Sequence, residues 1–169
     1  MSDPNGSPTP PPPAEAPVLH VERLYLKDLS FESPRAPGVF QEPGEPKVEL
    51  SLNTASERRG EEHFEVTIRI EAKVTNGSEV YFLVDVTYAG LFLLRNIPQP
   101  HLGMALGIEC PHILFPYVRQ IISQVVQDGG FKPMVLDPIN FAAMFHQAQS
   151  QRQAEVAAAS AEAERHVKQ

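Results

Sequence analysis

The chain has 169 residues, enough for one domain that buries a hydrophobic core and carries extensions. Its formal net charge of −7 argues against binding to nucleic acid or to an anionic membrane, because neutralising phosphates requires clustered Lys and Arg. One cysteine cannot form an internal disulfide, which is typical of a reducing compartment. The N-terminus has no apolar signal core, and the longest apolar run, residues 80–94, is too short to span a bilayer. We therefore expect no direct membrane insertion.

The two ends of the chain differ in composition from its middle. Residues 1–17 contain seven prolines and no periodicity, which predicts a disordered extension; a ligand for a proline-binding domain is the alternative. Residues 149–169 are rich in Ala, Gln and Glu and have little to bury, which predicts a flexible tail, either frayed helix or disorder. Residues 18–148 remain as the domain.

Residues 18–33 predict the first strand, although its alternation is imperfect. Arg23 and Lys27 interrupt the apolar positions, which indicates a β-bulge or a strand with two partly covered faces. In the second half of this strand, three polar side chains point together away from the apolar ones: Asp28, Ser30 and Glu32.

Alternation predicts three further antiparallel strands, over residues 47–53, 64–75 and 80–88, the last continuing at 91–94. A two-residue turn at Asn76 and Gly77 would pair Val74 with Glu79. A three-residue loop pairs Val74 with Val80 and keeps apolar residues together, so we expect that register. It leaves an outer face that carries Leu83, Asp85 and Thr87. A leucine among carboxylates is a candidate docking patch, and an incidental exposed leucine is the alternative.

Two helices are predicted after the strands. Pro116 suits a first helical turn, the apolar pattern continues to Val126, and Gly129-Gly130 ends the helix. The apolar side chains cover roughly half of the helix circumference, wider than an ordinary stripe. Core packing is one explanation, and contact with another subunit or a client chain is the other; the candidate interface residues are Tyr117, Ile121, Ile122 and Val125. For the second helix, Asp137 is the predicted N-cap and Pro138 the first helical residue.

Four antiparallel strands followed by two helices predict an α+β fold, a four-stranded antiparallel sheet with both helices on one face. Neither the phosphate-binding nor the dinucleotide-binding glycine motif occurs, and the spacing of Cys110 and His112 matches no zinc signature. A nucleophilic Cys110–His112 pair oriented by Asp128 or Glu109 is the enzymatic alternative; a lone cysteine beside an apolar helix is more often a small hydrophobe. We expect no catalytic residues, no metal site and no cofactor.

Several runs of the chain resemble SecB, the family of bacterial protein-export chaperones. The resemblance extends from about Val21 to Phe145 and is strongest in KDLSFE at residues 27–32, in LG at 106–107 with CP at 110–111 and ILFPY at 113–117, and in PINF at 138–141 with Phe145.

The resemblance implies an oligomeric chaperone. Members of the family form homotetramers, as dimers of dimers, in the bacterial cytoplasm. They hold unfolded precursor proteins without ATP and hand them to the SecA motor ATPase of the translocase. Apolar grooves that bind many unfolded segments weakly suit such a role.

The resemblance also implies two sets of site residues. The SecA-docking positions are Asp28, Glu32, Leu83 and Asp85, which alternation places on the outer face. The candidate client-groove residues are Phe40, Val48, Leu50, Leu52, Phe141 and Phe145. Packing in the hydrophobic core would explain each of them equally well. The alternative function within this fold is an oligomeric adaptor dedicated to one partner, such as a toxin–antitoxin pair.

Overall fold

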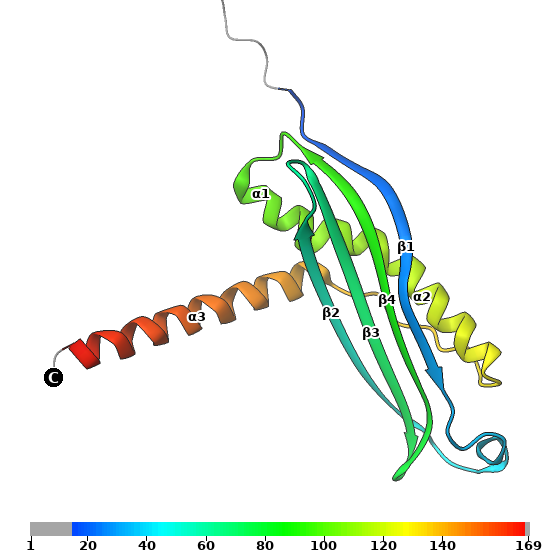
Figure 1. Cartoon of the computed structure of the whole chain (residues 1–169). Coiled ribbons are helices and arrows are strands. Elements are labelled where there is room, and N and C mark those ends of the chain that lie inside the picture. Colours follow the sequence, from blue (N-terminus) through cyan, green and yellow to red (C-terminus); the bar gives the residue numbers. More distant parts are fainter. Residues whose placement is uncertain (1–14, 168–169) are drawn as a thin grey trace, which may run out of the picture.

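The computed structural model describes residues 15–167, which form one antiparallel sheet with helices on one face (Figure 1). The strands lie in the order β1-β4-β3-β2, with bounds β1 Val18–Glu32, β4 Glu79–Arg95, β3 His63–Asn76 and β2 Lys47–Arg58. The helical segments are η1 Gly38–Gln41, α1 Gln99–Met104, η2 Ala105–Glu109, α2 Cys110–Asp128 and α3 Phe141–Val167. The predicted α+β class is confirmed.

The core lies between the sheet and α2. On β3, alternate residues such as Val66, Ile68 and Ile70 are fully buried, as their alternation with polar residues predicts. Along α2 every fourth residue is fully buried, and these residues are Cys110, Leu114, Val118, Ile122 and Val126. Such a stripe makes one continuous contact with the sheet, and each large aliphatic side chain in it contributes roughly 1.5–3 kcal/mol.

The register of the β3–β4 hairpin differs from the predicted one. Gly77 and Ser78 form a two-residue turn, with Gly77 at a φ of 60°, and Asn76 pairs with Glu79. Tyr81 then forms a bulge, so that Val74 pairs with Phe82 rather than with Val80. The bulge pairs apolar residues with apolar residues across the two strands, as the predicted three-residue loop would also have done. The predicted faces are unchanged, because the observed partner of Val74 lies two residues from the predicted one, and two residues are one full pleat.

The start of the main helix was predicted wrongly. Pro116 lies inside α2, which begins at Cys110 and follows α1 and the π-helical segment η2 without a break. In η2 the Cys110 N–H donates to the carbonyl of Ala105, five residues back, just before Pro111 interrupts the donors. Pro116 has no N–H to donate to the His112 carbonyl, and both residues lie on the exposed side of the helix.

The second helix also begins later than predicted. Residues 131–140 run without regular secondary structure, and α3 starts at Phe141. Its cap is Asn140 instead of Asp137, because the Asn140 Oδ1 accepts a hydrogen bond of 2.9 Å from the Ala143 N–H. A proline at position 138 therefore lies before the helix rather than in its first turn.

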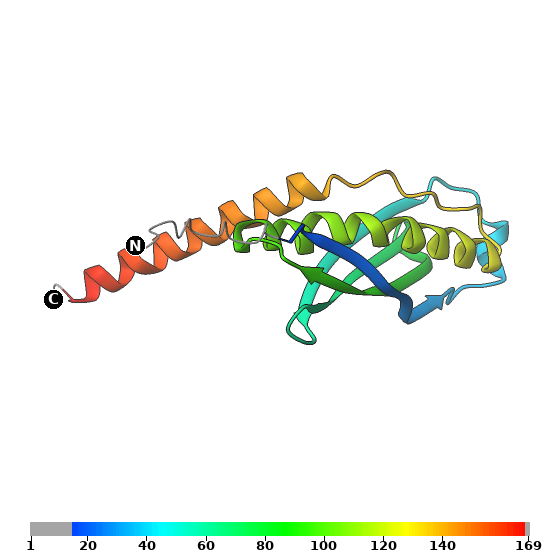
Figure 2. The same ribbon diagram turned by 90° about the horizontal axis from the view of Figure 1, so that it is seen from above.

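The predicted division of the chain stays a prediction, because residues 1–14 and 168–169 lie outside the described part. Residues 15–17 have no regular secondary structure. Residues 149–167 continue α3 as helix, and the side chains of 149–160 are all exposed. Figure 2 shows this part of α3 projecting away from the sheet.

Candidate docking face and binding groove

A bulge in β1 orients the predicted docking residues. Leu26 pairs with Tyr88 and Asp28 with Thr87, so Lys27 is an extra residue on β1. Without it, Asp28 would lie opposite Val86 and face the helices. The bulge expected from the interrupted alternation is therefore confirmed, and it turns Asp28, Ser30 and Glu32 to the outer face.

The outer face carries three rows of side chains across the four strands. The sheet register aligns Asp28, Thr87, Arg69 and Asn53 in the first row; Ser30, Asp85, Glu71 and Ser51 in the second; and Glu32, Leu83, Lys73 and Glu49 in the third. We call these twelve residues the docking face. The four predicted docking residues thus lie on neighbouring strands, within one patch.

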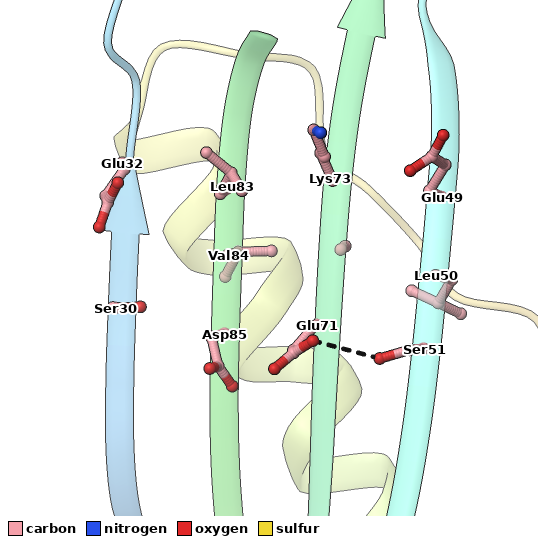
Figure 3. A pocket seen from close by; sticks show the side chains of 11 residues that line it. Ser30, Glu32, Glu49, Leu50, Ser51, Glu71, Lys73, Leu83, Val84 and Asp85 are labelled. Atoms are coloured by element: carbon pink, nitrogen blue, oxygen red, sulfur yellow. Dashed lines mark hydrogen bonds between the residues drawn. The ribbon is translucent and has the colours of Figure 1, made fainter.

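The docking face is hollowed over its second and third rows. A depression of about 470 Å³ lies there, with Glu32 and Leu83 on one side and Glu49 on the other. Figure 3 shows these side chains on the side of the sheet away from α2, with the Asp85 and Glu71 carboxylates on adjacent strands. The Ser51 hydroxyl donates to the Glu71 carboxylate at 3.4 Å. Carboxylates around an apolar leucine suit a cationic partner segment with an apolar side chain.

One cation, Arg69, is bound within this acidic surface. Its Nε and Nη2 donate to the two carboxylate oxygens of Asp85 at 3.1 and 2.6 Å, and Nη2 also forms an ion pair with Glu71. The hydrogen bond to Asp85 and the negative charges of Asp85, Glu71 and Asp28 raise the pKa of the guanidinium.

Further along the same face, Glu65 is buried although alternation assigns it to solvent. Only 5% of it is exposed. Its carboxylate accepts hydrogen bonds from the Tyr25 hydroxyl at 2.5 Å, from Arg59 Nη2 at 2.6 Å and from Lys27 Nζ at 2.9 Å. These bonds lower the pKa of Glu65 to about 2, the Tyr25 bond contributing most. Burial, reinforced by the carboxylate, raises the pKa of Tyr25 to about 12.

A groove lies on the opposite side of the sheet, between the edge strand β2 and α3. A cavity of about 630 Å³ is bounded by residues 52–56 of β2, by Gly103, Leu106 and Gly107, and by the first turns of α3. It brings together three of the predicted groove residues, Leu52, Phe141 and Phe145.

Two of the other predicted groove residues extend this cavity along β2. Val48 and Leu50 lie on the helix-facing side in line with Leu52 and are 55% and 44% exposed, because no helix covers this part of the edge strand. At the far end Phe40, itself 50% exposed, packs 5.2 Å from the ring of Phe131. An exposed apolar row, Val48 and Leu50, therefore runs along β2 to Leu52 and the cavity. Phe40 belongs instead to a cluster of rings, because Phe131 also packs on Phe31 of β1 and Phe82 of β4.

The predicted interface residues on α2 fall into two groups. Ile122 is fully buried against the sheet and belongs to the core of this chain. Tyr117, Ile121 and Val125 form a second stripe at the margin of the contact with the sheet: Tyr117 is 43% exposed, and Ile121 and Val125 are half-buried against the core. The Tyr117 ring stacks on Tyr88 at 5.8 Å, beside β1.

Sequence reasoning missed the Glu65 cluster and the role of Arg69. Both residues were assigned to a polar face by alternation, and nothing local distinguishes them from their neighbours. Their partners come from distant segments, 40 residues away in the case of Tyr25 and 16 in the case of Asp85. An imperfect alternation at Lys27 was the one local signal of the bulge that brings Lys27 to Glu65.

The fold has a solved relative. The structure of the SecB-like chaperone Rv1957 of Mycobacterium tuberculosis, solved with a ChAD peptide from the Rv1956 HigA1 antitoxin, superposes with a TM-score of 0.60 and covers 72% of this chain and 90% of that one. The sequences are 17% identical, so this likeness concerns the fold alone. The class that the architecture defines is the SecB-like fold.

Sequence comparison defines the family. The family "Preprotein translocase subunit SecB" matches residues 13–152. The protein-export protein SecB of Magnetococcus marinus is 55% identical over 84% of this chain and 91% of its own length, and that of Desulfotalea psychrophila 46% identical over 85% and 94%. The chain belongs to the SecB family of protein-export chaperones. Within residues 15–167, none of the helices has the length and apolarity needed to cross a membrane.

Proposed function

We propose that the protein binds unfolded precursor proteins along the β2 groove without ATP, keeps them translocation-competent, and delivers them to SecA through the docking face, as a homotetramer in the bacterial cytoplasm. The observation that carries the proposal is the exposed apolar row of Val48 and Leu50 on β2, which leads to the cavity at Leu52 and Phe145, on a chain of the SecB family. A folded monomer gains nothing from leaving such a row uncovered.

The groove suits an extended client chain of almost any sequence. Within the described residues β2 pairs only with β3, so its other edge presents unpaired backbone N–H and C=O groups. A client segment that pairs with this edge gains sequence-independent hydrogen bonds, while its apolar side chains contact Val48, Leu50 and Leu52. Many such contacts, each weak, give strong capture of a long unfolded chain.

Assembly is supported by the second stripe of α2. Tyr117, Ile121 and Val125 form an apolar surface beside Leu26 and Leu29 of β1, which are 44% and 38% exposed. An apolar helix stripe and an apolar strand margin side by side are typical of surfaces that another copy covers.

The docking face supports delivery to a cationic partner. Its carboxylates and Leu83 lie on the side of the sheet opposite to the groove. A client and SecA can therefore be held at the same time, and carboxylates there provide steering and register for basic groups of the motor.

Two double variants test the two surfaces separately. We expect Val48→Ser with Leu50→Ser to abolish the slowed refolding of several unrelated unfolded proteins and to leave SecA binding unchanged. We expect Asp28→Ala with Asp85→Asn to weaken SecA binding and leave refolding assistance intact. Glu61→Gln with Glu155→Gln removes the same two charges from exposed sites elsewhere and serves as the control.

The opposite pattern, with clients lost and SecA binding retained in Asp28→Ala with Asp85→Asn, would mean that the two surfaces are exchanged. If the protein assists one client only among those tested, the dedicated adaptor replaces the general chaperone as the function.

A further inference from the structure

Arg69 lies in the first row of the docking face and binds the Asp85 carboxylate of the central row, which a partner would need. Both oxygens of Asp85 accept hydrogen bonds from its guanidinium, at 2.6 and 3.1 Å, and Glu71 pairs with the same group. Asp85 is 25% exposed at its side chain and Arg69 51%. The two-pronged geometry is the one that an arginine of a partner protein would itself use.

The surroundings remain acidic even with Arg69 in place. The three rows hold five carboxylates, Asp28, Glu32, Glu49, Glu71 and Asp85, against the two cations Arg69 and Lys73, so three negative charges are uncompensated. These charges attract a cationic partner from a distance, while the Asp85 carboxylate at the centre is already bound.

We propose that Arg69 is a specificity-determining residue of the docking face, an internal competitor that a cationic partner segment must displace from Asp85. The inference rests on the docking role proposed above. A partner with one isolated charge gains little by replacing Arg69, since it exchanges one ion pair for another. A segment with several cations also pairs with the carboxylates that Arg69 and Lys73 leave uncompensated. It therefore binds more tightly than a segment with one charge, and this difference in affinity gives the selectivity.

Displacement fits the geometry better than a role in positioning Asp85. The Asp85 side chain is short and extends from the middle of β4, between the paired strands β1 and β3, so its direction is set by the sheet. The Arg69 side chain is long and half exposed, and it is therefore the partner that moves. An exposed ion pair of this kind is weak, typically 0.2–1 kcal/mol, so displacing it costs little.

The test compares Arg69→Gln and Arg69→Lys with the wild-type protein. With SecA as the probe, in titrations at low and high salt, we expect Arg69→Gln to bind about two- to fivefold more tightly at low salt. Arg69→Lys, which keeps the charge without the fork, should lie between Arg69→Gln and the wild type. The gain should shrink in an Asp85→Asn background, because only Glu71 is then released from Arg69.

A matched control removes an ion pair elsewhere on the sheet. Arg95 pairs with Glu62 at 2.8 Å, ten residues along β4 from Asp85 and about 33 Å away at strand spacing. Arg95→Gln makes the same change in net charge, so Arg69→Gln must exceed it. Unchanged or weaker binding by Arg69→Gln, or a gain that is just as large with Asp85→Asn, overturns the inference.

A second probe separates this inference from the docking role. A tetralysine peptide, titrated by NMR at low salt, reports the accessible charge of the face without SecA. If Arg69→Gln tightens peptide binding while SecA binds no variant, the shielding by Arg69 is correct and the docking role is wrong. If Asp28→Ala with Asp85→Asn weakens SecA binding while Arg69→Gln strengthens neither probe, the docking role stands and the inference fails.

Discussion

Glu65 is a buried carboxylate whose hydrogen bonds join β3 to β1 and to the β2–β3 connection. Tyr25 and Lys27 reach it from β1, and Arg59 reaches it from the connection before β3. With 5% of the residue exposed, an unpaired charge there would be costly, and three donors compensate for its desolvation. The cluster ties the edge strand β1 to β3 across β4.

Glu65 predicts a pH dependence of stability. Its folded-state pKa of about 2 lies below the ordinary value of 4.5, so its contribution is complete above pH 4.5 and is lost as the pH falls toward 2. A shift of this size corresponds to roughly 3 kcal/mol. We expect Glu65→Gln to lower the free energy of unfolding at pH 7 by about 2 kcal/mol and to flatten its decline between pH 4.5 and 3.

The measurement is urea denaturation at fixed protein concentration, since assembly couples to stability. Glu49→Gln is the control, an exposed carboxylate on the same face of the sheet. A wild-type pH profile in Glu65→Gln would show that the three donors are not what stabilises the fold.

At the scale of elements, close contact between η2 and α3 forms one end of the groove. A Cβ at Gly107 would overlap the ring of Phe145, whereas a Cβ at Gly103, one helical turn earlier, would make an ordinary contact of 3.6 Å with the same ring. The absence of a side chain at Gly107 therefore sets the distance between these two helical segments.

Gly107→Ala should displace Phe145 and the start of α3. We expect about 1–2 kcal/mol of destabilisation from overpacking and weaker client binding. Gly103→Ala is the matched control and should be neutral or slightly stabilising, because alanine favours helix. Thermal unfolding and a client-binding titration measure the two effects; equal behaviour of the two variants would contradict this account of the groove.

The strands could be predicted from the sequence because alternation is a local signal. The regular pattern around Val66 and Ile70 identified both the strand and its buried face. The interruption of the alternation at Lys27 indicated the bulge in β1. Strand pairing depends on residues far apart in the sequence, so the bulge at Tyr81 was missed. The inner and outer faces of the two strands were nevertheless predicted correctly.

Helix boundaries were less accessible to prediction. Proline preferences suggested that Pro116 starts a helix, but the chain already enters α2 in helical form, and the exposed side of the helix tolerates the lost hydrogen bond. Asp137 and Asn140 are equally good caps by residue type, and only the packing of the preceding extended segment decides between them. For the candidate site, alternation placed Leu83 and Asp85 on the outer face, whereas the Arg69 pair depended on tertiary register.

At the scale of the whole molecule, two apolar surfaces are left uncovered in one chain. One is the row of Val48 and Leu50 along β2, and the other is the outer stripe of α2, where Tyr117 is exposed and Ile121 and Val125 are half-buried. We propose that client chains cover the first and that other copies of the chain cover the second. Both assignments follow from the same excess of apolar surface, so they can be tested together.

Native mass spectrometry of the full chain, with and without an unfolded precursor, tests this claim most directly. We predict a tetramer, at about four times the 18.7 kDa mass of the chain, and a shift to a tetramer with one bound precursor when that precursor is added. A monomer at micromolar concentration that shows no bound precursor would contradict the account.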